Sequence, residues 1–535
     1  MVIFACFFCT PNIFKRYLLI IAVLAALFIY SCKKETIIKT PPVDKPETPA
    51  SPATIAAVKI EAKYNKALTE DIDATIGTND TITAVLPAAD AKKKLVITYT
   101  PTTTGRIVRL NDTLQINGST VIDYSKGVKC EVTASSGDIK KYVLIVKVFT
   151  GLPILYINTT APVTSKDNYV KGNVTVDANT GLSTDKASLS TQIKGRGNST
   201  WALFPKKPYR LKLDAKASVL GMPAAKNWVL LANYDDKTLM RNYIALKLAR
   251  RLGSSYAADC KFVEVVLNGD HIGNYLLTAQ VEVHENGVNI AELKPQNTSA
   301  DDITGGYLLE LDTRLDEKYW FKTAKNLPFT IKSPEDITPA QLNYIQTYVQ
   351  NAENALFSPT FGDPNTGYAK YFDVDSFINW YFTEEVVQNQ DGRDYSSMFY
   401  YKDRNGKIGM GPVWDFDLSA GNVDYSPAKN PTGIWYIRDA TWMMRLAQDP
   451  GFITKVRNRW AQIKDREVKQ IFTDIDQTAA YLKLSQQKNF TRWPILTKYV
   501  WPNAVVLGSY DLEVAYMKDF ITQRVGWLNN NMASF

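Results

Sequence analysis

The amino-acid sequence predicts an α+β protein in which two lobes flank a cleft and a small all-β sandwich precedes them. Three observations lead to this architecture. The chain has 535 residues, more than one compact core accommodates, which suggests two to four domains. Short alternating strand patterns separated by turn residues fill the region 57–150. From residue 151 strand patterns come first, and helical periodicity then dominates, as is typical of α+β lobes. The helical patterns cover residues 238–253, 339–357, 374–389 and 511–532.

Residues 1–32 have the pattern of a lipoprotein signal peptide. A basic pair precedes an apolar run over residues 17–30, which is too short to span a bilayer comfortably and fits a signal-peptide core better. The run ends in a serine followed by Cys32 and looks like a bacterial lipobox, so Cys32 is expected to carry a lipid. An anchor helix with a stray cysteine is the alternative. Residues 33–56 are rich in Pro, Thr and charge and predict a disordered tether.

Composition narrows the classes of function. The net charge of +8 is a mild excess carried by scattered Lys and Arg residues, so nucleic-acid binding has no support. His271 and His284 are the only histidines, which leaves a zinc site or a Ser-His-Asp triad almost nothing to build from. Both are expected to be structural or exposed. The region 57–150 holds no constellation of catalytic residue types and is interpreted as an Ig-like spacer or binding module. Any chemistry is therefore expected to use carboxylates, Lys and a bound cation.

The segment 389–422, NQDGRDYSSMFYYKDRNGKIGMGPVWDFDLSAGN, places carboxylates at both open ends of a predicted hairpin. Asn405-Gly406 between the two apolar strands is a strong turn signal. Pairing about this turn puts Ser396 nearly opposite Asp415, with Asp391 in the loop before the outgoing strand. A loop Asp, a hairpin and then Asp-Phe is the order in which protein kinases position a catalytic base and a metal-binding Asp. An acidic loop with a solvated turn is the alternative.

A second stretch, KGRGNSTWALFPKKPYRLKL, combines a glycine turn with a basic strand. Gly195, Gly197 and Asn198 predict a tight turn whose backbone can approach phosphates. The basic residues that follow are Lys206, Lys207, Arg210 and Lys212. Glycine turn, basic strand and acidic hairpin together describe a nucleotide site with a divalent cation between phosphates and carboxylates. A carbohydrate-acting enzyme with paired carboxylates is a further hypothesis, but it has no place for the glycine turn.

These stretches carry a family resemblance. The motifs, in order, are GRGNSTW…FPKKPYRLKL, NWVLLANYDDKTLMRN, NGDHIGNYLLTAQVEV, GGYLLELD, NQDG and GPVWDFDLSAGN. They closely resemble the CotH family, the spore-coat-protein-H-like atypical kinases, over about residues 152–535. The chain is also similar to the lipoprotein form found in Bacteroidetes-type bacteria, in which an Ig-like module precedes the CotH domain. The resemblance thus implies a kinase-like domain over residues 151–535.

The resemblance implies a protein kinase that binds ATP with Mg²⁺ or Mn²⁺ and phosphorylates Ser or Thr of envelope or secreted proteins. Asp391 would be the catalytic Asp, Asp415 the metal-binding Asp and Asp417 a second metal ligand. Lys212 is the first choice for the Lys that pairs with the phosphates, and Lys206 or Lys207 are alternatives. The residues Asp235, Asp236 and Arg241 lie in a matching segment and are expected to support the nucleotide site without an assigned role.

One position departs from a conventional kinase. Ser396 stands where such a kinase has its metal-binding Asn. Either Asn389 or Asp417 supplies the missing oxygen, or only one metal binds tightly. A catalytically inactive binding or assembly protein, such as an adhesin or scaffold, is therefore the alternative function. In both cases the lipid on Cys32 would hold the protein at the bacterial cell envelope, expected at the outer membrane facing the periplasm or the surface.

Overall fold

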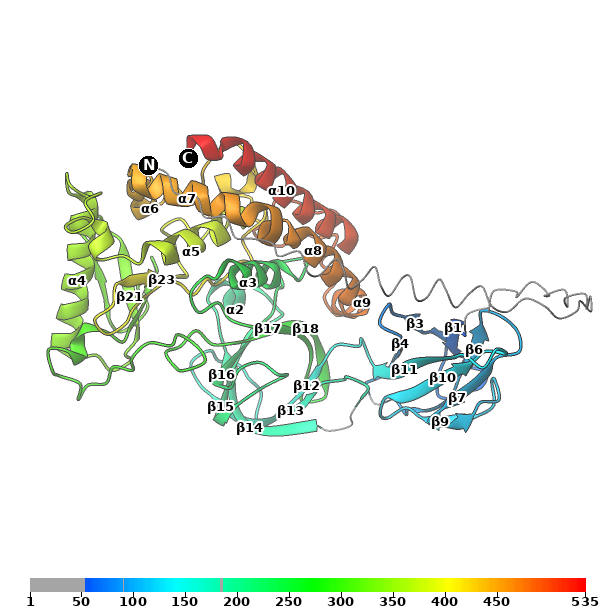
Figure 1. Ribbon diagram of the computed structural model, residues 1–535. Coiled ribbons are helices and arrows are strands. Elements are labelled where there is room, and N and C mark those ends of the chain that lie inside the picture. Colours follow the sequence, from blue (N-terminus) through cyan, green and yellow to red (C-terminus); the bar gives the residue numbers. More distant parts are fainter. Residues whose placement is uncertain (1–52, 90, 183–185) are drawn as a thin grey trace, which may run out of the picture. The chain divides into compact units, whose positions relative to one another are not determined.

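The structure is a computed structural model that describes residues 53–89, 91–182 and 186–535 (Figure 1). The predicted signal peptide with Cys32, and almost all of the predicted tether, lie outside these ranges. Within them, no helix has both the length and the apolar character needed to cross a bilayer.

The N-terminal part of the described chain, up to about Thr150, is the β-rich region that the alternating patterns predict. Three sheets form it, in the orders β2-β1-β6, β3-β4-β11-β10-β7-β8 and β5-β9. Every second residue of a strand such as β4 is buried, because successive side chains point to opposite faces. The strands are β1 (Ile55–Ile60), β2 (Ile72–Asp73), β3 (Thr75–Ile76), β4 (Thr81–Leu86), β5 (Lys94–Val96), β6 (Thr98–Pro101), β7 (Ile107–Leu110), β8 (Thr113–Leu114), β9 (Val121–Asp123), β10 (Val128–Thr133) and β11 (Ile139–Val148). A β-rich region before an α+β part is thus confirmed, and its Ig-like identity stays a prediction.

The next seven strands close into a barrel in the order β12-β13-β14-β15-β16-β18-β17. Parallel pairing of β12 with the distant β17 closes it, with Ile154 opposite Glu264. One apolar cluster that includes Ile157, Ile193 and Trp228 belongs to these strands. The strands are β12 (Ile154–Thr159), β13 (Val170–Asp177), β14 (Lys186–Gly195), β15 (Tyr209–Ala217), β16 (Ala225–Leu231), β17 (Cys260–Leu267) and β18 (Asp270–Ala279). The sequence predicts strands here but not the closed barrel.

A further sheet, in the order β20-β21-β19-β22-β23, carries the predicted hairpin. β22 (Met398–Lys402) and β23 (Ile408–Met410) pair antiparallel about Asn405-Gly406, so the hairpin is confirmed. Ser396 and Asp415 lie just beyond the strand ends, at the open end of the hairpin. The other edge of β22 pairs with β19, a contact that the sequence did not predict. The remaining strands of this sheet are β19 (Tyr307–Leu311), β20 (Trp320–Lys322) and β21 (Pro328–Ser333).

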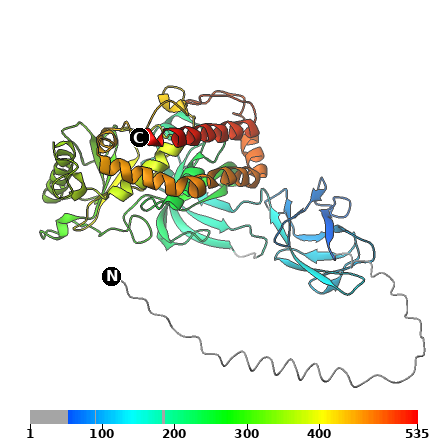
Figure 2. The ribbon, with the colours of Figure 1, turned by 45° about the horizontal axis from the view of Figure 1, so that its top comes forward.

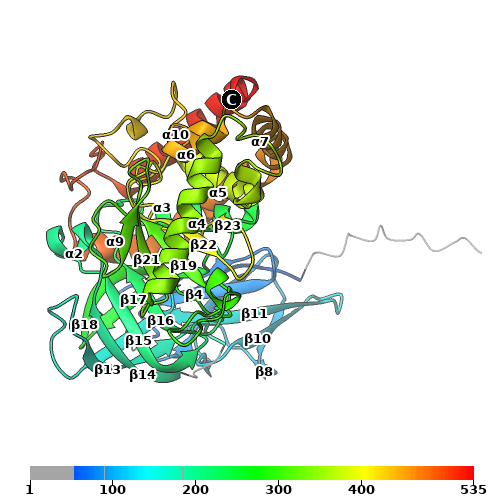
Figure 3. The ribbon, with the colours of Figure 1, turned by 90° about the vertical axis from the view of Figure 1, so that its left-hand side faces the viewer.

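The four predicted helical segments correspond to α3, α4, α5 and α10. α4 begins at a capping box formed by Thr338 and Gln341 and lies beside β19 (Figure 3). Its Tyr344 stacks on Tyr307 of β19. α10, red in Figure 2, packs against α5 and α8. The helices of the described chain are α2 (Ser199–Leu203), α3 (Arg241–Leu252), α4 (Pro339–Phe357), α5 (Val374–Val387), α6 (Thr441–Leu446), α7 (Pro450–Ile463), α8 (Gln470–Tyr481), α9 (Lys483–Arg492) and α10 (Tyr510–Asn531).

A buried ion pair fixes α10 against α5. Arg524 of α10 pairs with Glu385 of α5, and both side chains are fully buried. Glu385 also accepts hydrogen bonds from the main-chain N–H groups of residues 436–438. Because both charges are satisfied, their role is structural, and removing one partner of such a pair costs about 3–5 kcal/mol. The pair thereby positions the end of α5, which leads directly into the loop that carries Asp391.

Candidate active site

A cavity of about 490 Å³ brings together the glycine turn and the acidic hairpin that the sequence predicts as a nucleotide site. Residues from the end of β16 and from β19 complete its acidic lining. The predicted lining residues are Gly195, Gly197, Asn198, Asp391, Asp415 and Asp417, and the additional acidic ones include Asp235, Glu310 and Asp312. Segments that lie far apart in the sequence therefore meet at one site.

The glycine turn connects β14 to the short helix α2, and sterics require both of its glycines. Gly197 has a φ of +80°, a conformation that L side chains rarely adopt. A Cβ on Gly195 would lie 2.3 Å from the ring of Trp201, so that Trp201 has a packing role. The Asn198 side chain accepts a hydrogen bond of 2.9 Å from Lys166. The turn therefore presents its backbone to the cavity without side-chain bulk at the two glycines.

Asp391 is held as a buried carboxylate with one free oxygen. It is 5% exposed, and its Oδ2 accepts a hydrogen bond of 3.1 Å from the Ser396 hydroxyl. Its Oδ1 is buried and has no partner among the described residues. Burial raises the pKa of Asp391 to about 7, and the negative charge of Asp415 adds to the rise. A carboxylate with this pKa can accept a proton near neutral pH.

Asp415 is positioned by its backbone and by its neighbours. Its φ of +65° is rare for a non-glycine residue and indicates a conformation imposed by the surrounding structure. Ser397 donates a hydrogen bond of 3.5 Å to Asp415 Oδ2, and the Asn389 amide donates one of 3.2 Å to its main-chain oxygen. Asn389 does not line the cavity, whereas Asp417 does. Of the two alternatives for the missing metal oxygen, the geometry favours Asp417.

Asp417 and Asp235 form a buried carboxyl pair at the bottom of the site. Asp235 lies just after β16 and is 3% exposed. Burial raises the pKa of Asp235 to about 7 and that of Asp417 well above its usual range. The negative charge of Asp235 adds to the rise at Asp417. Asp235 Oδ1 is buried and has no partner in the described chain. The sequence placed Asp235 near the site but gave it no role.

The structure does not bring the three predicted lysines to the cavity. Lys206 is 1% exposed, and its ammonium donates to the main-chain oxygen of Asn274 and, over 2.9 Å, to Asn489 of α9. Lys207 donates to the main-chain oxygen of Trp201. Lys212 stands over the ring of Tyr169 at 5.8 Å. None of the three lines the cavity. Lys206 and Lys207 bind other segments of the chain, and Lys212 lies farther along β15 than Arg210, which does line the cavity.

Arg196 is the cation that the sequence interpretation missed. It lies between the two glycines of the turn and lines the cavity. Its guanidinium lies 5.8 Å from the ring centre of Trp414. Burial lowers the pKa of Arg196, and Asp415 and Asp417 oppose this change. Within the described chain Arg196 forms no ion pair, and neither do the lining residues Lys166 and Lys194, whereas Arg210, Arg314 and Lys332 pair with Glu282, Asp312 and Glu310.

Asp236 and Arg241 support the site from outside the cavity. They form a buried ion pair of 2.5 Å. Arg241 also donates to the main-chain oxygens of Ser419 and Ala420, so it holds the loop that follows Asp417. This agrees with the supporting role expected for both residues.

Neither histidine belongs to the cavity. His271 shares a hydrogen bond of 2.7 Å with the buried Glu264, and its ring lies edge-on to Phe149. The ring Nδ1 of His284 accepts a hydrogen bond from the main-chain N–H of Asn286. Both histidines therefore have structural contacts, as expected from the sequence.

The donor set fits a divalent cation bound together with a nucleotide. In the described residues no group of three or more His, Cys, Asp or Glu side chains is arranged as a complete ligand cluster. Mg²⁺ is usually held by one or two carboxylates plus phosphate and water oxygens, so a complete protein cluster is not required. The buried, unpartnered oxygens of Asp235 and Asp391 face the same cavity. Carboxylates of this kind suit a hard cation.

The cavity is thus lined by a glycine turn, by carboxylates and by Arg196, which has no ion pair in the described chain. The family model described as "CotH kinase protein" matches residues 193–528. The match covers well over half of the chain, so the protein belongs to the CotH kinase family. A search of curated proteins finds no match.

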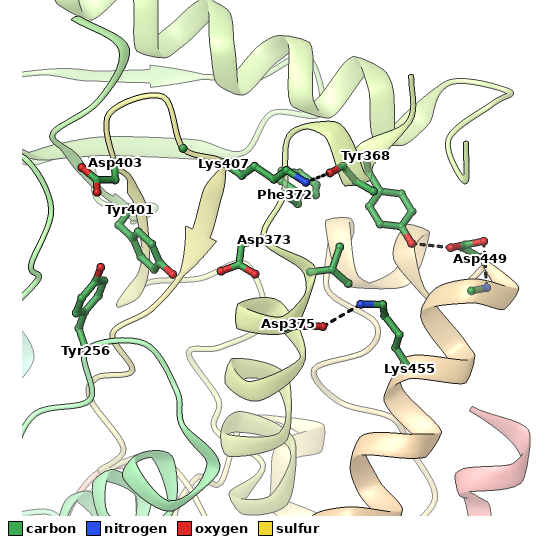
Figure 4. Close-up of a pocket in the computed structure, with 14 residues that line it drawn as sticks. Tyr256, Tyr368, Phe372, Asp373, Asp375, Tyr401, Asp403, Lys407, Asp449 and Lys455 are labelled. Atoms are coloured by element: carbon green, nitrogen blue, oxygen red, sulfur yellow. Dashed lines mark hydrogen bonds and ion pairs between the residues drawn. The ribbon is translucent and has the colours of Figure 1, made fainter. Parts of the chain in front are cut away.

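A second cavity, of about 650 Å³, lies between α5, α7 and the β22–β23 hairpin (Figure 4). Its lining combines aromatic rings with charged side chains, among them Tyr256, Phe372, Asp373, Tyr401, Lys407, Asp449 and Lys455. Asp449 accepts hydrogen bonds from the first turn of α7 and from the Tyr368 hydroxyl, and Lys455 pairs with Asp375. These charged groups are already bound to protein partners, so nothing in this cavity indicates a ligand.

Proposed function

We propose that this protein is an ATP-dependent kinase that phosphorylates Ser or Thr hydroxyls of envelope or secreted proteins, with Mg²⁺ or Mn²⁺ as metal cofactor. One observation carries the proposal: a glycine turn faces carboxylates in a single cavity, and two buried oxygens, Asp391 Oδ1 and Asp235 Oδ1, have no partner in the described chain. Buried polar atoms are normally satisfied, so such exceptions mark a place where a ligand binds. Membership of the CotH kinase family supports the same activity.

Asp391 would orient the acceptor hydroxyl and take its proton. Ser396 occupies one carboxylate oxygen, which leaves Oδ1 free for the substrate. As the acceptor oxygen bonds to the γ-phosphorus, the bond from that phosphorus to the β–γ bridging oxygen breaks and ADP leaves. The proton of the hydroxyl passes to Asp391, whose pKa of about 7 suits this transfer.

The remaining lining residues would bind the nucleotide. The backbone of Gly195, Gly197 and Asn198 would contact the phosphates, and Asp415 and Asp417 would hold the divalent cation. A bound cation supplies charge neutralisation for the phosphates. Arg196 replaces Lys212 as the side chain assigned to the phosphates, because a guanidinium in the cavity can donate two parallel hydrogen bonds to phosphate oxygens.

A catalytically inactive binding or assembly protein is the second candidate. Ser396 favours it, because a hydroxyl that already donates to Asp391 is a poor metal ligand at the position where a conventional kinase has Asn. In that case partner binding would survive the substitutions Asp391→Asn and Asp415→Ala.

The deciding experiment is a transfer assay with soluble protein that starts after Cys32. The protein is incubated with γ-labelled ATP, Mn²⁺ and a generic Ser/Thr-rich protein, beside the variants Asp415→Ala and Asp336→Ala. Asp336 is exposed and does not line the cavity, so its variant controls for a general loss of carboxylate charge. Label transfer in the wild type and in Asp336→Ala, but not in Asp415→Ala, supports the kinase. Absence of transfer, together with no thermal stabilisation by nucleotide, would rule it out.

We further propose that a lipid on Cys32 anchors the protein at the cell envelope, where its protein substrates reside. The apolar run followed by Ser-Cys supports this proposal. Mass spectrometry of the full-length protein expressed in a bacterium would detect a diacylglycerol on Cys32, and Cys32→Ala would move the protein from the membrane to the soluble fraction. A wild-type protein that retains residues 1–31 would contradict the proposal.

A further inference from the structure

The backbone around Asp235 is held from two sides. Its main-chain oxygen accepts hydrogen bonds from Asn422, over 3.1 Å, and from Asn503, over 2.6 Å. The next residue, Asp236, is locked into the buried ion pair with Arg241. Because its own main-chain oxygen and the next residue are both fixed, Asp235 is held at the cavity that it lines.

The Asp235 carboxylate meets another carboxylate there rather than a cation. Asp417 is its neighbour: the Asn422 amide donates to the main-chain oxygens of both residues, over 3.1 Å and 2.8 Å, and both residues line the same cavity. No Lys or Arg of the described chain forms an ion pair with either group; the nearest basic residues along the chain, Lys237 and Arg241, pair with Glu513 and Asp236. Two carboxylates buried together without a cation are unfavourable unless a proton or a metal ion lies between them.

The Oδ1 atom of Asp235 indicates whether a proton or a metal ion lies between the two carboxylates. A proton shared with Asp417 satisfies one oxygen of Asp235, yet Oδ1 remains buried and without a partner in the described chain, on a residue that lines the cavity. A divalent cation placed between the two side chains accounts for this oxygen, since hard cations take carboxylate oxygens from several chain segments.

We propose that Asp235 is a direct ligand of the divalent cation, together with Asp417. This inference rests on the proposed function, because phosphate and water oxygens of a bound nucleotide complete the ligand set. Asp235 follows a barrel strand, whereas Asp417 follows the hairpin. The cation therefore ties the barrel to the segment that carries the catalytic loop, and the metal site draws on more of the chain than the Asp-Phe-Asp motif.

The test compares Mn²⁺ affinity in five forms of the soluble protein: wild type, Asp235→Asn, Asp417→Asn, the double variant of these two, and Asp312→Asn. Asp312→Asn is the matched control, because it removes one negative charge from the same cavity but Asp312 already pairs with Arg314. Free Mn²⁺ is measured by electron paramagnetic resonance in the presence of a non-hydrolysable ATP analogue. Affinity for that analogue is measured separately in EDTA, and thermal melting in EDTA checks folding.

We expect Asp235→Asn to weaken Mn²⁺ binding by about tenfold or more, since even residues behind a metal ligand typically contribute 10- to 100-fold. Asp417→Asn should give a similar loss, and the double variant should lose much less than the product of the two, because both residues bind one ion. Asp312→Asn should stay within about threefold. Nucleotide affinity in EDTA should not fall in Asp235→Asn.

Two outcomes would overturn the inference. Mn²⁺ affinity of Asp235→Asn within about twofold of wild type would show that Asp235 is no ligand, as would an equal loss in Asp312→Asn. A different result would reject only the proposed kinase: wild type binds Mn²⁺ and the analogue, Asp235→Asn loses Mn²⁺, and no phosphoryl transfer occurs with ATP. If wild type binds neither Mn²⁺ nor nucleotide, both proposals fail.

Discussion

Two cavities of this protein differ in what their polar groups are doing. The cavity in Figure 4 is the larger one, yet Asp449 caps α7, Asp373 caps α5, and Lys455 pairs with Asp375. The smaller cavity holds Asp235 and Asp391, each with a buried oxygen that no described residue satisfies. Buried polar atoms without partners require an explanation, and two carboxylate oxygens of this kind on residues of one cavity favour a binding site there.

The first prediction has the largest expected effect and addresses this contrast directly. Asp391→Asn should lower kcat by about 10²- to 10⁴-fold, the usual contribution of a positioned general base, with little change in ATP affinity. Asp373→Asn, which keeps the size and the capping function of a carboxylate in the other cavity, should leave kcat unchanged. Steady-state kinetics of the two variants measures both. Similar losses in the two would erase the distinction between the cavities.

The second prediction concerns the cation that binds the phosphates. Arg196→Gln should raise KM for ATP by about tenfold, because a charge-assisted hydrogen bond contributes about 1.5–3 kcal/mol. Lys212→Gln should leave KM within about twofold, since Lys212 lies outside the cavity. If Lys212→Gln weakens ATP binding and Arg196→Gln does not, the assignment made from the sequence is right and the one made from the cavity is wrong.

The hairpin, the glycine turn and the basic strand β15 show which features the sequence could predict and which it could not. The hairpin and the glycine turn depend on local chemistry, Asn405-Gly406 in one and the two glycines in the other, so they were predicted correctly. Strand alternation puts Arg210 and Lys212 on one face of β15, but two residues of strand separate them by about 7 Å, and only Arg210 reaches the cavity.

Other features depend on contacts between distant segments, which local patterns do not encode. The ammonium of Lys206 donates to Asn489 of α9, near the other end of the chain, and Lys206 does not line the cavity. Asp235 follows the barrel strand β16 and Asp417 follows the hairpin, and the Asn422 amide joins them by donating to the main-chain oxygens of both. The α+β class was therefore within reach of the sequence, whereas the full set of site residues required the tertiary fold.

The third prediction uses pH to sharpen the comparison. Asp391 has a pKa of about 7 in the folded protein against 3.8 as its reference. Between about pH 4 and pH 7 the folded state keeps a proton that the unfolded chain has lost, so wild-type stability falls as pH rises through this window. Asp391→Asn lacks this group, so its Tm relative to wild type should rise from pH 4 to pH 7 and then level off.

Between about pH 4 and pH 7 the free energy of unfolding of Asp391→Asn relative to wild type should change by a few kcal/mol, on the order of 1.4 kcal/mol for each unit of pKa shift. Melting curves in EDTA, which removes any bound metal, would measure it. A Tm difference for Asp391→Asn that is constant with pH would mean that the carboxylate is not held in the unfavourable environment described above.

The fourth prediction has the smallest effect and tests the second cavity from its own side. Asp375→Asn breaks the ion pair with Lys455, whose side chains are 78% and 56% exposed. Exposed pairs of this kind contribute about 0–1 kcal/mol, so Tm should fall by no more than about 2 °C, and kcat and KM for ATP should not change. A loss of activity without a loss of Tm would show that this cavity binds something the reaction needs. In that case satisfied polar groups would not be enough to identify a structural cavity, and the criterion that separates the two sites would have to be abandoned.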